Sequence, residues 1–132
     1  MYVRFVRPNR VKGMAAREGF FTAAYDLRKT STTNLHTAQQ VTALLDWFKL
    51  NLPEPASFTR SSSKGQYRAV FTKGLSWFKP EATEMLAKAR EMTVLLAENG
   101  YPIETLRSNR IGYVLYEDAD QIVAEPFSDT PS

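Results

Sequence analysis

The sequence predicts a single α+β domain, with one antiparallel or mixed sheet and two helices packed on one face of that sheet. Short apolar runs bounded by Gly, Pro, Asn and Asp occur near both ends of the chain, whereas apolar residues recur at helical spacing in two segments between them. The 132 residues suffice for one core, and no linker divides them. We therefore expect one domain over 1–132, in the order ββαβαβββ, with a disordered tail at 128–132.

Two strands are expected near the N-terminus, paired as a hairpin. In the stretch 1–7, MYVRFVR, Val3 and Phe5 point to one face, and Pro8 ends the run. A long connection with Pro, Asn and Gly follows. The stretch 20–28, FFTAAYDLR, is the second expected strand, because alternate apolar residues fall on one face: Phe21, Ala23, Tyr25 and Leu27.

The first helix is expected to begin near Thr37 and to end at Pro53. Thr37 and Gln40 fit a capping box, in which the Thr hydroxyl satisfies a free amide of the first turn. Apolar residues then recur at i, i+3, i+4, i+7 and i+11, which is the spacing of one helical face: Val41, Leu44, Leu45, Phe48 and Leu52.

The second helix is expected to begin at Pro80 and to end at Asn99-Gly100. Proline is tolerated in the first turn, where its missing N–H has no helical partner, and Gly adopts the left-handed conformation of helix ends. Glu81 and Glu84 suit the positive end of the helix dipole. The expected buried stripe is Ala82, Met85, Leu86, Ala89, Met92, Thr93 and Leu96.

The remaining apolar runs predict strands. A broken strand is expected over 67–78, with a bulge at Gly74, after a polar loop over 53–66. The last third predicts three strands, over 101–107, 111–117 and 121–127. The acidic residues between the last two strands are typical of a hairpin turn.

The sequence contains two Trp-Phe-Lys stretches about thirty residues apart, at Trp47 and at Trp77. The first lies late in the predicted helix, and the second ends a predicted strand, so the two are not a structural repeat. Two explanations remain open. Either both stretches anchor the core, or the two indoles form a shared aromatic surface.

The composition argues against several kinds of chemistry. The chain has no Cys and a single His, His36, so it has no disulfide, thiolate nucleophile or multi-histidine metal site. Neither a Gly-x-Ser-x-Gly elbow nor a phosphate-binding glycine motif occurs. We therefore expect no metal and no cofactor, and an enzyme is not favoured. Because no apolar run has the length of a signal peptide or a membrane span, we expect a cytoplasmic protein with no membrane partner.

Charge is divided unevenly along the chain. Residues 1–79 hold 13 basic and 4 acidic side chains, whereas residues 80–132 hold 4 basic and 10 acidic ones. The two halves neutralise each other if they interleave in one sheet; otherwise the basic half suits nucleic acid, with cations on phosphates and tyrosines on bases. The candidate binding residues are Arg4, Arg7, Arg10, Lys12, Arg17, Arg60, Lys64, Tyr67 and Arg68.

The stretch GYVLYEDADQIVAEPF, together with AAYDLR and the two Trp-Phe-Lys segments, resembles an uncharacterised family of small bacterial proteins, some from mobile or accessory genomic regions. The resemblance spans most of the chain. It implies a bacterial intracellular or phage-related setting, and it implies no activity or site residue for this sequence.

Three functions are compatible with these observations. The first is a non-catalytic binding or regulatory domain that acts through a protein partner or by self-association. The second is a nucleic-acid-binding protein that uses the basic residues above. The third is a small enzyme for an anionic substrate, with Arg7, Arg10 and Arg28 as anion clamps and with Asp26 or Glu117 as the acid/base.

Overall fold

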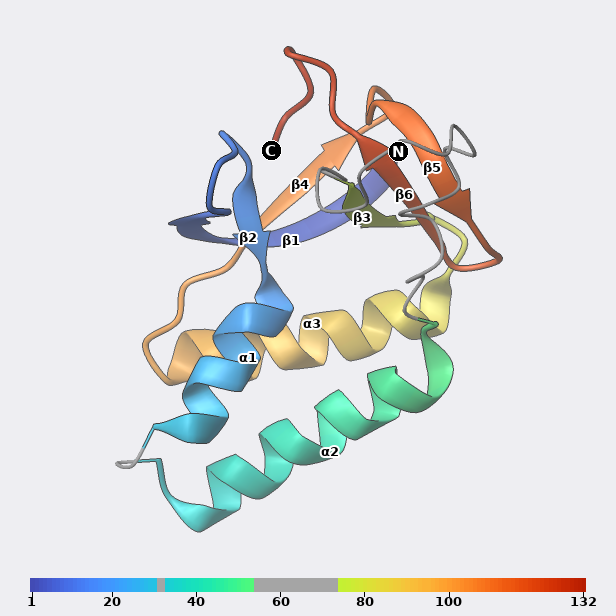
Figure 1. The fold of residues 1–132 in the computed structure, drawn as a ribbon. Helices are drawn as coiled ribbons and strands as arrows, with labels where there is room; N and C mark the ends of the chain where they lie inside the picture. The colour runs from blue at the N-terminus through green and yellow to red at the C-terminus, as the bar shows by residue number, and fades with distance from the viewer. Residues whose placement is uncertain (31–32, 54–73) are drawn as a thin grey trace, which may run out of the picture.

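The computed structural model describes residues 1–30, 33–53 and 74–132. This part of the chain forms an α+β domain with one antiparallel six-stranded sheet and three helices below one of its faces (Figure 1), which confirms the predicted fold class. The elements are β1 (Tyr2–Arg10), β2 (Arg17–Gly19), α1 (Phe20–Lys29), α2 (Leu35–Asn51), β3 (Leu75–Phe78), α3 (Thr83–Glu98), β4 (Glu104–Ser108), β5 (Tyr113–Glu117) and β6 (Gln121–Glu125).

Strand β1 pairs with three other strands, which is more than any other described strand of the sheet. Val3 pairs with Phe78 of β3 and with Arg107 of β4, and Val6 pairs with Gly19 of β2 and with β4. One edge of β1 is therefore taken by β4, and β2 and β3 share the other edge. On its other edge, β3 pairs with β6, and β6 pairs with β5. All of the described strand pairs in this sheet are antiparallel.

The segment 20–28, predicted as a strand, is the helix α1, and the prediction of two helices is wrong. Its buried residues are Phe20, Ala23, Ala24 and Leu27, at the i, i+3, i+4 and i+7 spacing of a helix. The segment fits both periods, and packing against the other helices decides in favour of the helical one. The strand that follows β1 in sequence and pairs with it is instead the short β2, directly before α1.

The other two helices follow the predicted stripes. Val41, Leu44, Leu45 and Phe48 are all buried in α2. Its cap, however, is Asn34, whose side chain accepts a hydrogen bond from the Thr37 amide at 2.8 Å, so the helix begins before the predicted capping box.

Helix α3 begins at Thr83, three residues after the predicted start at Pro80. Its buried stripe includes Leu95, which was not predicted, and Thr93, which was predicted to be buried, is only partly buried. The predicted stop is confirmed. Gly100 has a φ of 89°, and the Tyr101 amide donates to the carbonyl of Leu96. No described helix is long and apolar enough to span a membrane.

Buried apolar residues form two clusters, one on each face of the sheet. The helix-side cluster joins β1 and β3 to the three helices and contains five phenylalanine rings in contact with one another: Phe5, Phe20, Phe21, Phe48 and Phe78. The far-side cluster is smaller and consists of Val6, Ala16, Leu75, Trp77, Leu106, Ile111, Ile122 and Ala124. Neighbouring residues of one strand therefore lie in different clusters: Trp77 is in the far-side cluster and Phe78 is in the helix-side cluster.

The C-terminal tail packs back onto the domain. The amide of Arg17 donates to the carbonyl of Ser132 at 3.2 Å, and Thr130 is buried. Arg110 pairs with Asp129 at 2.8 Å. The segment 128–132, expected to be disordered, thus lies beside β2 instead of extending away from the sheet.

Candidate functional site

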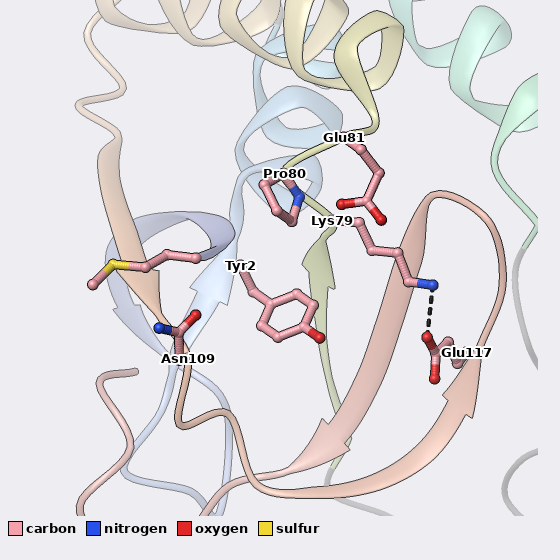
Figure 2. Close-up of a pocket in the computed structure, with 7 residues that line it drawn as sticks. Tyr2, Lys79, Pro80, Glu81, Asn109 and Glu117 are labelled. Atoms are coloured by element: carbon pink, nitrogen blue, oxygen red, sulfur yellow. Dashed lines mark ion pairs between the residues drawn. The ribbon is translucent and has the colours of Figure 1, made fainter.

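A small polar pocket of about 220 Å³ lies where the second Trp-Phe-Lys stretch meets the β5–β6 hairpin (Figure 2). Tyr2, Glu81 and Asn109 line it, together with Lys79 and Glu117, whose Nζ and Oε2 atoms are 2.6 Å apart. The hydrogen bond to Glu117 raises the pKa of Lys79 above its ordinary value. A lysine held in its protonated form is a poor base or nucleophile, so this pocket does not favour acid–base chemistry at Lys79.

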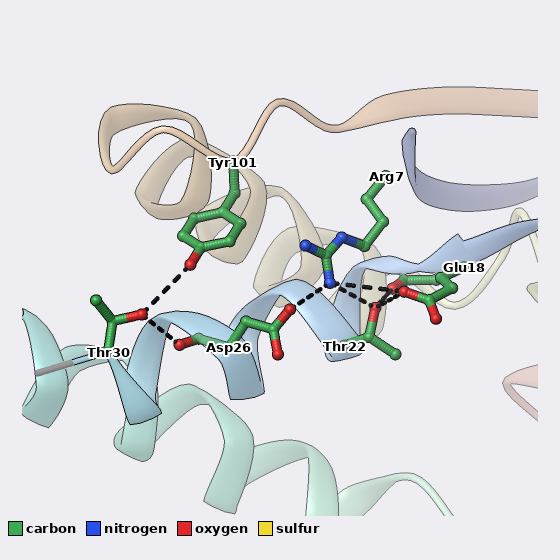
Figure 3. A network of polar contacts seen from close by, with 7 residues as sticks. Arg7, Glu18, Thr22, Asp26, Thr30 and Tyr101 are labelled. Atoms are coloured by element: carbon green, nitrogen blue, oxygen red, sulfur yellow. Dashed lines mark hydrogen bonds and ion pairs between the residues drawn. The ribbon is translucent and has the colours of Figure 1, made fainter. Parts of the chain in front are cut away.

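Arg7 is the centre of a polar network that ties β1 to α1 (Figure 3). Its Nη1 atom lies 2.7 Å from Asp26 Oδ2, 3.6 Å from Glu18 Oε1 and 3.4 Å from the Thr22 hydroxyl. Its guanidinium also lies 5.6 Å from the centre of the Tyr101 ring. The expected anion clamp and the expected acid/base, Arg7 and Asp26, are therefore paired with each other.

The other two expected anion clamps have different partners. Arg10 donates to the backbone carbonyl of Ala15, at the turn between β1 and β2. Arg28 lies on α1 with its guanidinium 5.1 Å from the ring centre of Tyr25. The structure thus gives each of the three arginines its own contacts and does not join them in one site.

The candidate nucleic-acid residues that the structure describes do not form one continuous cationic face. Arg4 is buried, Arg7 is paired with Asp26, and Arg17 Nη1 lies 2.6 Å from Glu104. Arg10 and Lys12 are exposed near the β1–β2 turn. Arg60, Lys64, Tyr67 and Arg68 lie outside the described residues.

Charges from the two halves of the chain meet in space. Arg17 of the basic half contacts Glu104 of the acidic half, and Lys79 contacts Glu117. This is the interleaving that the sequence left open as one explanation of the uneven charge, and it neutralises part of the basic half.

A second hollow, larger than the polar pocket, is a groove of about 410 Å³ between α2 and α3. Its apolar lining comes from Ala43, Leu44 and Trp47 of α2 and from Val94 and Leu95 of α3. The rim is polar: it has the neutral amide of Gln40, the positive charge of Lys88 and the negative charges of Glu91 and Glu98. Apolar walls with a charged rim are the usual composition of a protein-contact surface.

The α2 side of the groove follows from the helical repeat. Gln40, Ala43, Leu44 and Trp47 lie at i, i+3, i+4 and i+7, at the border of the core-facing stripe to which Leu44 belongs. The small side chain of Ala43 leaves space between its longer neighbours. Trp47 packs its inner side against the core, and the Lys88 ammonium lies 5.6 Å from the centre of its ring.

Apolar side chains also project from the helices that form the groove. Leu50, one turn beyond Trp47, is 86% exposed, and Val94 on the α3 wall is 57% exposed. The α3 side of the groove was not predicted, because the apolar spacing of that helix indicates only its buried stripe. Leu50 and Val94 could have indicated this surface, because they are large apolar residues that lie outside the predicted buried stripes.

The two tryptophans do not form a shared aromatic surface. Trp47 lies at the groove between the helices, whereas Trp77 has no exposed surface and belongs to the far-side cluster. The expectation that Trp77 is a surface residue is therefore wrong. On a central strand, its indole is covered by residues that are distant in sequence.

Comparisons with protein-family models, with curated proteins and with solved structures find no match to this chain. No function is therefore transferred from a relative. Of the two hollows described above, the α2–α3 groove is the larger and has the more apolar lining.

Proposed function

We propose that this protein is a non-catalytic binding domain that acts by self-association through the α2–α3 groove. The observation that carries the proposal is the presence of a hollow and of projecting apolar side chains on the same pair of helices. Leu50 and Val94 project, and the groove beside them is lined by Leu44, Trp47 and Leu95.

A surface with both a hollow and a projection suits a twofold dimer. In such an interface the same patch is used by both copies, so the projections of each copy enter the hollow of the other. Trp47 in the lining of the groove provides the kind of aromatic anchor that dominates contact energies.

The charges on the rim are compatible with this arrangement. Lys88 lies 3.8 Å from Glu91 within α3, and Glu98 lies further along the same helix. Two antiparallel copies of this rim place the lysine of one copy near the carboxylates of the other, and this attraction offsets part of the repulsion between the two glutamates on each rim.

The available surface sets the expected affinity. Helices of 17 and 16 residues are about 25 Å long, and two adjacent helices are roughly 20 Å wide. That footprint corresponds to a small interface, at or below the usual size for stable complexes, so we expect a dissociation constant on the order of micromolar.

The observations favour protein contact over the other two hypotheses. Several of the candidate cations for nucleic acid are engaged with Asp26, Glu104 or backbone carbonyls. The carboxylates expected to act as acid/base are paired with Arg7 and Lys79.

The test is the mass of the protein in solution, measured by sedimentation velocity from about 1 to 500 µM. Wild-type protein is expected to shift from monomer to dimer across this range, and Leu50→Glu is expected to stay monomeric because a charge then has to be buried at the contact. Leu35→Glu is the matched control, since Leu35 is 73% exposed at the opposite end of α2 and does not line the groove.

Two results would contradict the proposal. One is a monomeric wild-type protein at every concentration. The other is an equal loss of association in Leu35→Glu and Leu50→Glu, which would place the contact elsewhere. Far-UV circular dichroism shows whether each variant has kept its helices.

A further inference from the structure

Arg4 is a buried cation on the face of the sheet that points away from the helices. On β1, Val3 and Phe5 belong to the helix-side cluster, so the alternation of the strand turns Arg4 to the far side with Val6. Only 5% of its surface is exposed. Its Nη2 atom donates to the carbonyl of Arg17, whereas its buried Nη1 atom has no hydrogen-bond partner among the described residues.

Trp77 provides a second donor of the same kind in the same cluster. Its Nε1 atom is buried and lacks a hydrogen-bond partner within the described part of the chain. The pairing of Val3 with Phe78 in antiparallel strands places Trp77 opposite Arg4. Side chains opposite each other on one face of a sheet are close neighbours, with Cβ atoms about 5 Å apart.

The charge of Arg4 has no acidic counterpart within ion-pair distance among the described residues. Burial, and to a smaller extent the nearby charge of Arg17, lower its pKa to about 10, so the guanidinium stays protonated at neutral pH. Arg17 is itself close to an acid, Glu104, but that side chain is 61% exposed. A charged group in an apolar cluster is destabilising unless an opposite charge accompanies it.

We propose that the far-side cluster binds a small oxyanion, held by Nη1 of Arg4 and Nε1 of Trp77 and attracted by the charge of Arg17. Guanidinium and indole N–H groups donate hydrogen bonds and accept none, so their natural partner is an acceptor oxygen. Phosphate, sulfate and carboxylate have oxygens of this kind and also supply the missing negative charge.

The adjoining tail already shows the preference of this corner for acceptor oxygens. The main-chain oxygen of Ser132 accepts from both the amide and Nε of Arg17, each at 3.2 Å. An anion at Arg4 places a further acceptor oxygen in the same corner.

The test is thermal unfolding in sodium chloride with up to about 10 mM phosphate, sulfate or acetate at matched ionic strength. At these concentrations the general stabilising effect of such salts is small. An anion present at a free concentration of about ten times its dissociation constant is expected to raise the Tm of the wild-type protein by roughly 4 °C. The three probes distinguish a tetrahedral oxyanion from a carboxylate.

Arg4→Met is expected to abolish this rise and to unfold at a temperature equal to or above that of the wild type in chloride, because it buries no unpaired charge. Trp77→Phe, which keeps the ring and removes the donor, is expected to lose part of the rise. Arg10→Met is the control, since Arg10 is exposed on the same strand, and it is expected to keep the whole rise.

Two outcomes would overturn the proposal. A wild-type Tm that is the same in all four salts would mean that no anion is bound, and a full rise in Arg4→Met would mean an adventitious ion only. If Arg4→Met does not fold, isothermal titration of wild-type and Trp77→Phe protein with inorganic phosphate decides the question, and equal affinity for the two proteins contradicts the assignment of Trp77.

Discussion

The two faces of the sheet carry cores of different character. On the helix side, phenylalanine rings from β1, β3, α1 and α2 lie with centres 4.4 to 6.3 Å apart, beside apolar residues of α3. On the far side, eight buried apolar residues share their space with the donors of Arg4 and Trp77 that have no described partner. The helix side has the composition of a core that provides stability, and the far side has groups that a ligand can satisfy.

The same strands build both cores. In β1, Phe5 faces the helices and Arg4 faces away, and in β3 Phe78 and Trp77 divide in the same manner. Because successive residues of a strand point to opposite faces, polar groups can gather on one side without interrupting the packing on the other.

The largest expected effect compares equal truncations in the two cores. Leu96→Ala, at a fully buried site in α3, is expected to lower the free energy of unfolding by about 4 kcal/mol, and Leu106→Ala by about 2 kcal/mol. Leu106 lies on β4, which pairs only with β1 among the described residues, so its surroundings can collapse more easily. Urea unfolding measures both values, and equal losses would show that the two cores are equally rigid.

A smaller effect is expected at Gly112, where the chain enters β5 beside the far-side cluster. Its φ is 123°, and a Cβ atom there would lie 1.9 Å from the carbonyl oxygen of Glu125. Gly112→Ala is therefore expected to cost about 3 kcal/mol. Gly13→Ala is the control, since Gly13 has a φ of 81° but no atom lies within 4 Å of the added methyl. Its free energy of unfolding, measured in urea, is expected to fall by about 1 kcal/mol. Equal losses of unfolding free energy in the two variants would mean that the left-handed backbone conformation causes the loss and that the contact with Glu125 adds nothing.

The smallest effect concerns Asp118 in the β5–β6 turn. Partial burial opposes its ionisation, but hydrogen bonds from the Asp120 amide, from the side chain and amide of Gln121 and from the Tyr116 hydroxyl outweigh burial and lower its pKa. A lowered pKa in the folded state stabilises the fold above the ordinary pKa of aspartate. That contribution is lost as the pH falls through the folded value.

Asp118→Asn is accordingly expected to cost about 1 kcal/mol at pH 7, with the difference from wild type shrinking below about pH 4. Urea unfolding at pH 7, 5 and 3 measures it. Asp120→Asn in the same turn is the control, with little change expected. A difference that stays constant down to pH 3 would show that the charge of Asp118 contributes nothing.

Part of the candidate site could be predicted from the sequence, because it depends on local periodicity. The stripes of α2 and α3 were readable from their spacing, and Gly100 ends α3 where its left-handed conformation was expected. The groove itself was not readable, because it exists only where two helices distant in sequence lie side by side. Trp47 was named as a surface candidate, but its neighbours Lys88 and Val94 were not.

The sequence by itself determined the fold class, two of the helices and the β5–β6 turn, because each is encoded by neighbours a few residues apart. Only the tertiary structure decided that 20–28 is helical, since Phe20, Ala23, Ala24 and Leu27 need the other helices to pack against. The tertiary structure also decided the surroundings of the basic residues. Arg4 is buried and Arg7 is paired with Asp26 because strands and helices far apart in sequence pack against them. Charge and exposure belong to the folded surface, and residue spacing along the chain cannot specify them.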